Sequence, residues 1–239
     1  AKILFKNSNF SMKLNKNKTI LGVGNGVLQL YPLKLYQEYH SFLITRYTKV
    51  NYIPFDPINN VMIKRLLIGL RTMFPNHECD TFEFIMHYFA SSLDAKDKPP
   101  MILFLVGGGS NGKSTLLEIV KAALDTYAVK INISFLTEKN SGSESATPQK
   151  MMLKDARLAY ASESNPNEVL NGAKMKEITG NETITGRFLN QDCEEFTPHC
   201  IYLVLSNSAL TVSGQDYATW RRIKMCRMKH QFKLKHQLN

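Results

Sequence analysis

Apolar residues recur at helical spacing in two stretches of the first hundred positions, residues 61–74 and 81–93. A spacing of three and four positions places the apolar side chains on one face of an α-helix. The first stretch carries Met62, Leu66, Leu70 and Met73, and the second carries Phe82, Ile85, Phe89 and Leu93. Asp80, with Glu83 three positions later, resembles a capping box at the start of the second helix. The pattern predicts two consecutive helices.

Continuous apolar runs at residues 101–106, 157–163 and 199–207 predict buried strands. The first run is followed by a Gly-rich stretch and a helix-forming run at residues 113–126. Strand, loop and helix in this order begin an α/β nucleotide-binding sheet. A further helix is expected to end at Gly180, followed by a strand at residues 183–189. The composition of residues 28–53 predicts short strands and a turn. Pro54 and Pro57 then interrupt any regular element.

Changes of composition along the chain predict three parts. Residues 2–18 carry five lysines and no acid, which favours a mobile basic arm over residues 1–20. Residues 21–96 are expected to form a small, mainly helical domain. The charged segment at residues 94–100 ends in two prolines, so we expect a boundary there. Residues 97–239 are then the nucleotide-binding domain.

The composition is that of a folded protein, with 44% hydrophobic and 21% charged residues among 239. The longest apolar run is far short of the roughly 20 residues that a membrane-spanning helix needs, and the N-terminus shows no secretory hydrophobic region. We therefore expect an intracellular, soluble protein with no membrane partner. The four cysteines lack the paired spacing of a zinc site, which indicates free buried thiols.

A formal net charge of +10 indicates a polyanionic partner, and nucleic acid is the first candidate. The alternative is that half of this charge only solubilises the two basic ends of the chain.

A phosphate-binding pattern, G-x-x-x-x-G-K-[ST], is complete at residues 107–114. In such a loop the backbone N–H groups converge on the phosphates, Lys113 reaches the β- and γ-phosphates, and the Ser114 hydroxyl ligates Mg²⁺. The predicted cofactors are therefore ATP and Mg²⁺. The predicted nucleotide-binding residues are Gly107, Gly108, Gly109, Ser110, Asn111, Gly112, Lys113, Ser114 and Thr115.

Three downstream positions complete the candidate catalytic set. Glu163 ends a predicted strand where an acid would position Mg²⁺ or water, although Ser162 precedes it where many such motors have a second acid. Asn207 ends another strand and is a candidate sensor of the γ-phosphate, or a simple turn former. Arg221 and Arg222 are candidates for an arginine that stabilises the transition state, or part of a solvated face. Lys174, Lys176 and Arg187 are candidates for contact with nucleic acid, with surface salt bridges as the alternative.

The order of these motifs resembles a superfamily 3 helicase. The segment at residues 176–187 fits K-x-[IL]-T-G-x-[DE]-x-I-x-[AG]-R, and Trp220 precedes the two arginines. The whole is similar to the primase-helicases of large DNA viruses, including poxvirus and African swine fever virus relatives, and of some phages and plasmids. The resemblance implies an AAA+-like P-loop NTPase sheet with flanking helices, preceded by the small helical domain.

The same resemblance implies a homo-hexameric ring that hydrolyses ATP between subunits and draws single-stranded or forked DNA through its pore. Lys113, Ser114, Glu163 and Asn207 would act within one subunit, and Arg222, or else Arg221, would reach in from the next. An upstream primase domain and a place in the host cytoplasm are also implied. One departure is the basic segment after Ile223, where the family continues with a hydrophobic-Pro-Phe stretch, which puts ring closure in doubt.

Two other functions fit the loop. One is a nucleotide-regulated DNA-binding or assembly module with little turnover, which Ser162 favours. The other is a small-molecule kinase, for which the sequence shows no evident acceptor pocket or lid motif.

Overall fold

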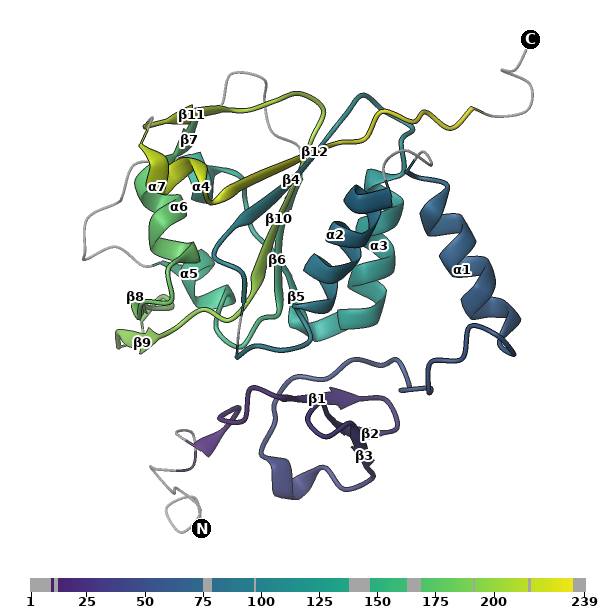
Figure 1. Cartoon of the computed structure of the whole chain (residues 1–239). Coiled ribbons are helices and arrows are strands. Elements are labelled where there is room, and N and C mark those ends of the chain that lie inside the picture. The colour runs from purple at the N-terminus through teal and green to yellow at the C-terminus, as the bar shows by residue number, and fades with distance from the viewer. Residues whose placement is uncertain are drawn as a thin grey trace.

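A five-stranded parallel sheet forms the centre of the molecule (Figure 1). The computed structural model describes residues 10, 13–74, 79–96, 98–137, 147–162, 169–190, 192–214 and 216–233. The strand order is β12-β4-β10-β6-β5. The strands are β4 (Ile102–Val106), β5 (Ala128–Lys130), β6 (Leu158–Ser162), β10 (Ile201–Ser206) and β12 (Ile223–Arg227). The strands predicted at residues 101–106, 157–163 and 199–207 are confirmed by β4, β6 and β10.

The parallel sheet separates two hydrophobic cores, because successive side chains of a strand point to opposite faces of the sheet. Leu103 and Leu105 of β4 belong to one core, and Phe104 belongs to the other. Helices α2 (Cys79–Ala90) and α3 (Lys113–Leu124) cover the first face. The second face is covered by α4 (Ser134–Thr137), α5 (Pro148–Met152), α6 (Gly172–Thr179) and α7 (Tyr217–Trp220). The predicted sheet with flanking helices is confirmed.

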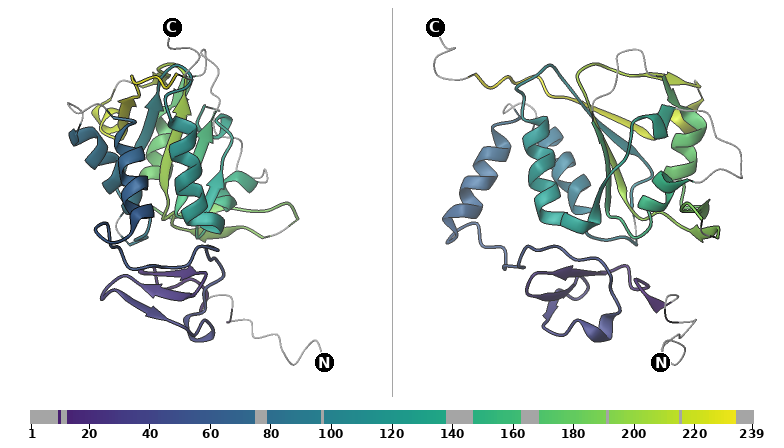
Figure 2. Two further views of the ribbon diagram at one scale, coloured as in Figure 1. Left: turned by 90° about the vertical axis from the view of Figure 1, so that its right-hand side faces the viewer. Right: turned by 180° about the vertical axis from the view of Figure 1, so that it is seen from behind.

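Helix α1 (Val61–Arg71) lies outside the layer that α2 and α3 form (Figures 1 and 2). Asn60 caps it by accepting hydrogen bonds from the backbone N–H groups of Met62 and Ile63. Of its apolar residues only Leu70 is buried. The two predicted helices are present, and each ends about three residues earlier than its apolar pattern.

A small antiparallel sheet precedes the helices, so the expectation of a mainly helical domain at residues 21–96 needs a correction. Its strands are β1 (Ile20–Val23), β2 (Gly26–Gln29) and β3 (Lys34–Tyr36), followed by the short helix η2 (His40–Phe42). It lies at the end of the parallel sheet where the strands begin (Figure 1). Because α2 packs into the core of the parallel sheet, the domain boundary at residue 97 stays a prediction.

Two arginines, the buried Arg157 and the half-buried Arg46, join the small sheet to the parallel sheet. The Arg157 guanidinium donates hydrogen bonds to the carbonyl oxygens of Lys18 and Ile20, and Arg46 donates to the carbonyl oxygen of Lys154. Lys18 also pairs with Asp155 at 3.3 Å. The predicted mobile arm therefore ends before residue 18, and its residues 1–9, 11 and 12 lie outside the described part of the chain.

The remaining elements are short. They are η4 (Asp125–Tyr127), which continues α3, and the strands β7 (Val169–Asn171), β8 (Ile184–Gly186), β9 (Glu194–Phe196) and β11 (Thr211–Ser213). Strands β8 and β9 form an antiparallel hairpin. Gly180 caps α6, as expected from the sequence. Cys200 and Cys226 are buried free thiols, whereas Cys193 is exposed, so the expectation of buried thiols is wrong at that position.

Candidate nucleotide-binding site

The loop at residues 107–112 connects the end of β4 to the start of α3. Gly112 has φ of +86° and Ser110 has φ of +60°, so the chain turns through left-handed conformations before the helix begins. Position 107 requires glycine because neighbouring atoms leave no space for a Cβ. A Cβ on Gly107 would lie 2.4 Å from Asn111 Nδ2 and 2.5 Å from the Met228 carbonyl oxygen.

Backbone N–H groups of this loop are available to a ligand. Within the described part of the chain, the N–H groups of residues 108–112 donate to no protein acceptor. They lie at the N-terminus of α3, a helix of 12 residues, where the helix dipole favours negative charge. The arrangement fits an anion such as the phosphates of a nucleotide.

Lys113 is the first residue of α3 and is held inside the loop. Its Nζ donates hydrogen bonds to the Gly107 carbonyl oxygen and to Asn111 Oδ1, the latter at 2.9 Å. The side chain is 7% exposed, and burial lowers the pKa of Lys113 from its ordinary value. Asn111 in turn donates to the Met228 carbonyl oxygen at 3.2 Å. Lys113 is therefore fixed through Asn111 to the segment that follows β12.

A cleft of about 430 Å³ opens beside Lys113, between α3 and the carboxyl ends of β10 and β6. This volume lies in the range of small-molecule sites. Asn207 follows β10 directly, and the Ser206 carbonyl accepts a hydrogen bond from the Gly107 N–H at 3.2 Å. The residues that line the cleft are Lys113, Ser114, Leu117, Glu118, Lys121, Lys130, Tyr160, Ser162, Leu205, Ser206 and Asn207.

The sheet thus brings Lys113, Ser114 and Asn207 together, as the predicted roles require. Glu163 lies outside the described residues, but Ser162, the last residue of β6, lines the same cleft. Among the described residues no group of three His, Cys, Asp or Glu side chains forms a metal site. The fit to Mg²⁺ therefore depends on the exposed Ser114 hydroxyl and on the oxygens of a bound nucleotide.

Arg221 and Arg222 lie at the opposite end of the sheet from the loop. They precede β12, in which Ile223 pairs with Ile102 and Arg227 pairs with Val106. Five residues at about 3.3 Å each separate them from the loop by roughly 16 Å, which is longer than an arginine side chain. Arg222 is half-buried and donates to Thr179 Oγ1 and the Ala218 carbonyl oxygen, whereas Arg221 is exposed. Neither arginine reaches the loop of its own chain.

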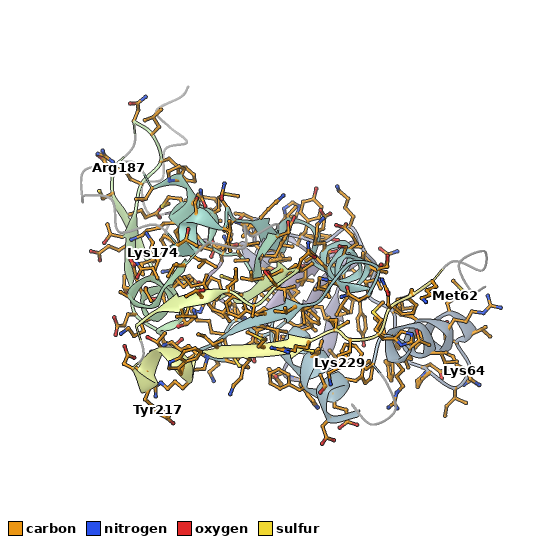
Figure 3. The ribbon with its side chains drawn as sticks, turned by 90° about the horizontal axis from the view of Figure 1, so that it is seen from above. Met62, Lys64, Lys174, Arg187, Tyr217 and Lys229 are labelled. Carbon is orange, nitrogen blue, oxygen red and sulfur yellow. The ribbon has the colours of Figure 1, made fainter. Side chains whose placement is uncertain are left out.

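The three residues predicted to contact nucleic acid differ in their surroundings. Lys174 is 7% exposed, with Nζ 5.3 Å from the centre of the Phe135 ring, which does not fit a side chain that contacts DNA. Lys176 pairs with Asp216 at 3.1 Å, so a surface salt bridge accounts for it. Arg187 lies at one end of the molecule (Figure 3). DNA contact by Lys176 or Arg187 stays a prediction.

Sequence reasoning missed four side chains of the cleft, namely Glu118, Lys121, Lys130 and Tyr160. Lys121 lies with Nζ 5.3 Å from the centre of the Tyr160 ring and pairs with Glu118, and Lys130 lines the same cleft. Lys121 lies eight residues after Lys113. Residues four apart lie on the same face of a helix, so the sequence could have predicted that Lys121 and Lys113 share a face. The position of Lys130 could not be predicted, because it lies in β5, a strand of three residues that is too short to show an apolar pattern.

The parallel sheet, the glycine-rich loop and the cleft at the carboxyl ends of the strands define a P-loop NTPase fold. A protein-family model described as "Family of unknown function (DUF5906)" matches residues 105–222. Among solved structures, the chain is similar to one titled "The A form apo structure of NrS-1 C terminal region-CTR". The TM-score is 0.57 and the identity 14%, over 79% of this chain and 43% of the other. At that identity the likeness shows the fold alone.

Curated relatives give the finer grouping. The chain is 37% identical over 235 residues to "Putative primase C962R" of African swine fever virus (isolate Warthog/Namibia/Wart80/1980), covering 97% of this chain and 24% of that protein. It is 30% identical over 217 residues to "Putative helicase L207/L206" of Acanthamoeba polyphaga mimivirus, covering 91% of this chain and 22% of that protein. These relatives are viral proteins named as putative primases or helicases, as the motif order predicts, and this chain spans about a quarter of their length.

Proposed function

We propose that this chain is the ATP-hydrolysing motor of a viral DNA helicase, working in replication as part of a primase-helicase. The observation that carries the proposal is the cleft at the end of the parallel strands. It gathers the cation of Lys113, the hydroxyl of Ser114 and the amide of Asn207 beside a loop whose backbone N–H groups donate to no acceptor among the described residues. Viral relatives of this chain carry the names of primases and helicases.

Each group in the cleft has a role that its chemistry permits. The loop N–H groups and Lys113 hold the phosphates of ATP, and Lys113 stabilises the charge that develops on the γ-phosphate. Ser114 and Glu163 would hold Mg²⁺, which neutralises phosphate charge when bound. Asn207 is placed to hydrogen-bond the γ-phosphate or the attacking water. Glu163 is the candidate to orient that water.

The arginine that completes the site comes from a neighbouring subunit in this proposal. The separation of roughly 16 Å along the strands excludes action within one chain. Because Arg222 is engaged with Thr179 and Ala218, the exposed Arg221 is now the stronger candidate of the two. Hydrolysis then requires an assembly, and we propose the homo-hexameric ring that the family resemblance implies. Single-stranded or forked DNA is its substrate, and the net charge of +10 favours this partner.

The test is steady-state ATP hydrolysis by the purified chain, with and without single-stranded DNA. Lys113→Ala is expected to abolish turnover, because the phosphates lose their cation. Lys154→Ala is the matched control, since Lys154 is a cation outside the cleft that pairs with Glu194. Near-normal hydrolysis by Lys113→Ala would refute the site, and hydrolysis that DNA leaves unchanged would refute the motor.

A second function, a nucleotide-regulated DNA-binding or assembly module with little turnover, is favoured by one observation. The residue at the end of β6 that lines the cleft is Ser162, a neutral group where a second acid would assist metal binding. Tight ATP binding without turnover, in an assembly that binds DNA, would support this function in place of the motor.

A further inference from the structure

The outer edge of strand β12 pairs with no other strand in the described part of the chain. β12 stands first in the order of the parallel sheet, and β4 is its neighbour on the inner side. Figure 3 shows β12, in yellow, at the margin of the sheet, with Lys229 just beyond its end. The basic segment that follows the two arginines in the sequence is this strand and its continuation, and the proposed function gives it no role.

Backbone groups of β12 that point away from β4 are available to a partner. The Arg222 carbonyl oxygen and the Met228 N–H both form hydrogen bonds with β4. The backbone groups of successive residues alternate between the two edges of a strand, so those of Ile223, Met225 and Arg227 point outward. Among the described residues, the N–H groups of Met225 and Arg227 donate to no acceptor. An exposed edge of this kind is a template for a further strand.

A groove of about 590 Å³ lies beside this edge, between β12 and helix α2. Its lining combines apolar side chains with charge. Phe84 of α2 is 37% exposed, whereas Leu103 and Cys226 are buried. The charged residues of the lining are three cations and one acid, namely Lys224, Arg227, Lys229 and Asp80. The groove therefore fits a segment that carries both apolar and acidic side chains.

We propose that an extended, acidic segment of a partner protein adds to the parallel sheet along β12. In recognition of this kind the backbone hydrogen bonds supply affinity, and the side chains select the partner. Acids opposite Lys224 and Arg227, with apolar residues opposite Met225 and Cys226, match the edge position by position. The expected recognition pattern is therefore acid, apolar, apolar, acid. This contact is separate from the nucleotide cleft and does not depend on ATP hydrolysis.

Two other occupants match the edge less well. A second copy that paired through its own β12, about the midpoint of the strand, would place Lys224 of each copy opposite Arg227 of the other. Like charges directly opposite each other on paired strands are destabilising. The sugar-phosphate backbone of DNA could neutralise the cations, but it has no donor for the outward carbonyl groups and leaves Phe84 without an apolar partner. An acidic peptide satisfies the backbone, the charge and the groove together.

The test uses a capped, fluorescein-labelled peptide, Glu-Thr-Glu-Val-Val-Glu-Thr-Glu, as the acidic probe. Its sequence reads the same in both directions, so it suits parallel or antiparallel pairing. Fluorescence anisotropy is expected to show saturable binding to the unchanged chain, and amide hydrogen exchange should slow at Met225 and Arg227. A probe with Pro-Pro in place of Val-Val keeps the charge and loses two backbone donors, so it should bind at least about tenfold more weakly.

Reversing the charge of the edge gives the matched variant. Lys224→Glu/Arg227→Glu should bind the acidic probe at least about tenfold more weakly. It should instead bind the lysine probe, Lys-Thr-Lys-Val-Val-Lys-Thr-Lys, and that binding also shows that the variant is folded. Lys64→Glu/Arg65→Glu is the control and should bind the acidic probe as the unchanged chain does, since both residues are exposed on α1, away from β12.

Four results would overturn the proposal. Equal binding of the valine and proline probes would show that charge alone accounts for the contact, and equal binding by the charge-reversed variant would place it elsewhere. Failure of the acidic probe to bind, together with loss of affinity for a thymidine oligonucleotide in the charge-reversed variant, would assign the edge to DNA. Dimers of the unchanged chain in sedimentation velocity that Met225→Pro dissociates, by removing an outward N–H, would assign it to a second copy.

Discussion

Asn111 is expected to set how readily Lys113 leaves its resting position for the phosphates of ATP. Its Oδ1 accepts a hydrogen bond from Lys113 Nζ at 2.9 Å, and its Nδ2 donates to the Met228 carbonyl oxygen at 3.2 Å. Asn111 is 4% exposed, so both contacts are shielded from water. Asn111→Asp converts the contact with Lys113 into an ion pair, whereas Asn111→Ala removes it.

The magnitude follows from the change in bond type. Asn111→Asp changes a hydrogen bond in which only Lys113 is charged into one in which both partners are charged, and the two differ by about 1 kcal/mol or somewhat more. At 1.4 kcal/mol per factor of ten, Lys113 is held roughly fivefold to tenfold more strongly by an aspartate. Asn111→Asp should therefore raise the KM for ATP by about that factor. Asn111→Ala should lower the KM for ATP, because Lys113 then leaves its resting position more readily, and should lower kcat several-fold, since Lys113 loses an orienting contact.

Initial rates across a range of ATP concentrations separate the two effects, and calorimetric titration with ATP checks the binding step. Asn181→Asp is the control, because Asn181 is exposed at the end of α6 and receives the same added charge away from the loop. Equal effects of the aspartate and alanine variants on KM and kcat would refute the reasoning, since a purely structural role for Asn111 predicts no such division.

Three further predictions follow from the fold and its charges. The Tyr88 hydroxyl donates to the Tyr202 carbonyl at 2.8 Å and accepts from the Tyr202 N–H at 3.1 Å. Tyr88→Phe should therefore lower the free energy of unfolding by about 2 kcal/mol, and a calorimetric scan should show a Tm lower by roughly 4–8 °C. Burial, with Lys18 and Lys98 nearby, lowers the pKa of His199 to about 4 from 6.5, so its contribution to stability is complete above pH 6.5 and is lost as the pH falls through 4. Denaturant titrations of His199→Gln should show a flatter pH dependence in that window, and an unchanged dependence would contradict the assignment. Affinity for single-stranded DNA should fall with salt by about 0.7 in the log-log slope per neutralised phosphate, and a flat response in fluorescence anisotropy would count against a basic DNA contact.

The parallel sheet and its loop could be predicted because their signals are local. Each of β4, β6 and β10 is a short apolar run, and the fixed positions of the loop lie within eight residues. The small sheet was predicted only in part, as short strands and a turn at residues 28–53, although Gly24 and Asn25 between β1 and β2 are a two-residue hairpin turn of a recognisable kind. Its strands of three and four residues are too short to show periodicity.

The surroundings of the site residues could not be predicted because they depend on contacts between distant segments. Asn111 and Met228 are 117 positions apart, and the burial of Lys174 under Phe135 arises from the packing of α6 on α4. The choice of Arg221 over Arg222 as the arginine that acts on a neighbouring subunit also depends on a contact between distant segments. Arg222 is held by Thr179, 43 positions earlier, and nothing in the run of residues around Trp220 indicates this contact.

Mixing two inactive variants tests the central claim, that ATP is hydrolysed between subunits by Lys113 of one and an arginine of the next. Lys113→Ala and Arg221→Ala should each lose hydrolysis when assembled alone, the latter by roughly 10³-fold or more. Arg222→Ala, measured beside them, is expected to lose less, because its guanidinium is bonded within its own chain.

In an equal mixture of Lys113→Ala and Arg221→Ala chains, about a quarter of the interfaces combine an intact Lys113 with an intact Arg221 when subunits mix at random. Recovery of ATP hydrolysis on mixing, to a fraction of the unchanged chain's rate, is the result that the account predicts. A mixture that forms assemblies and remains inactive would contradict it.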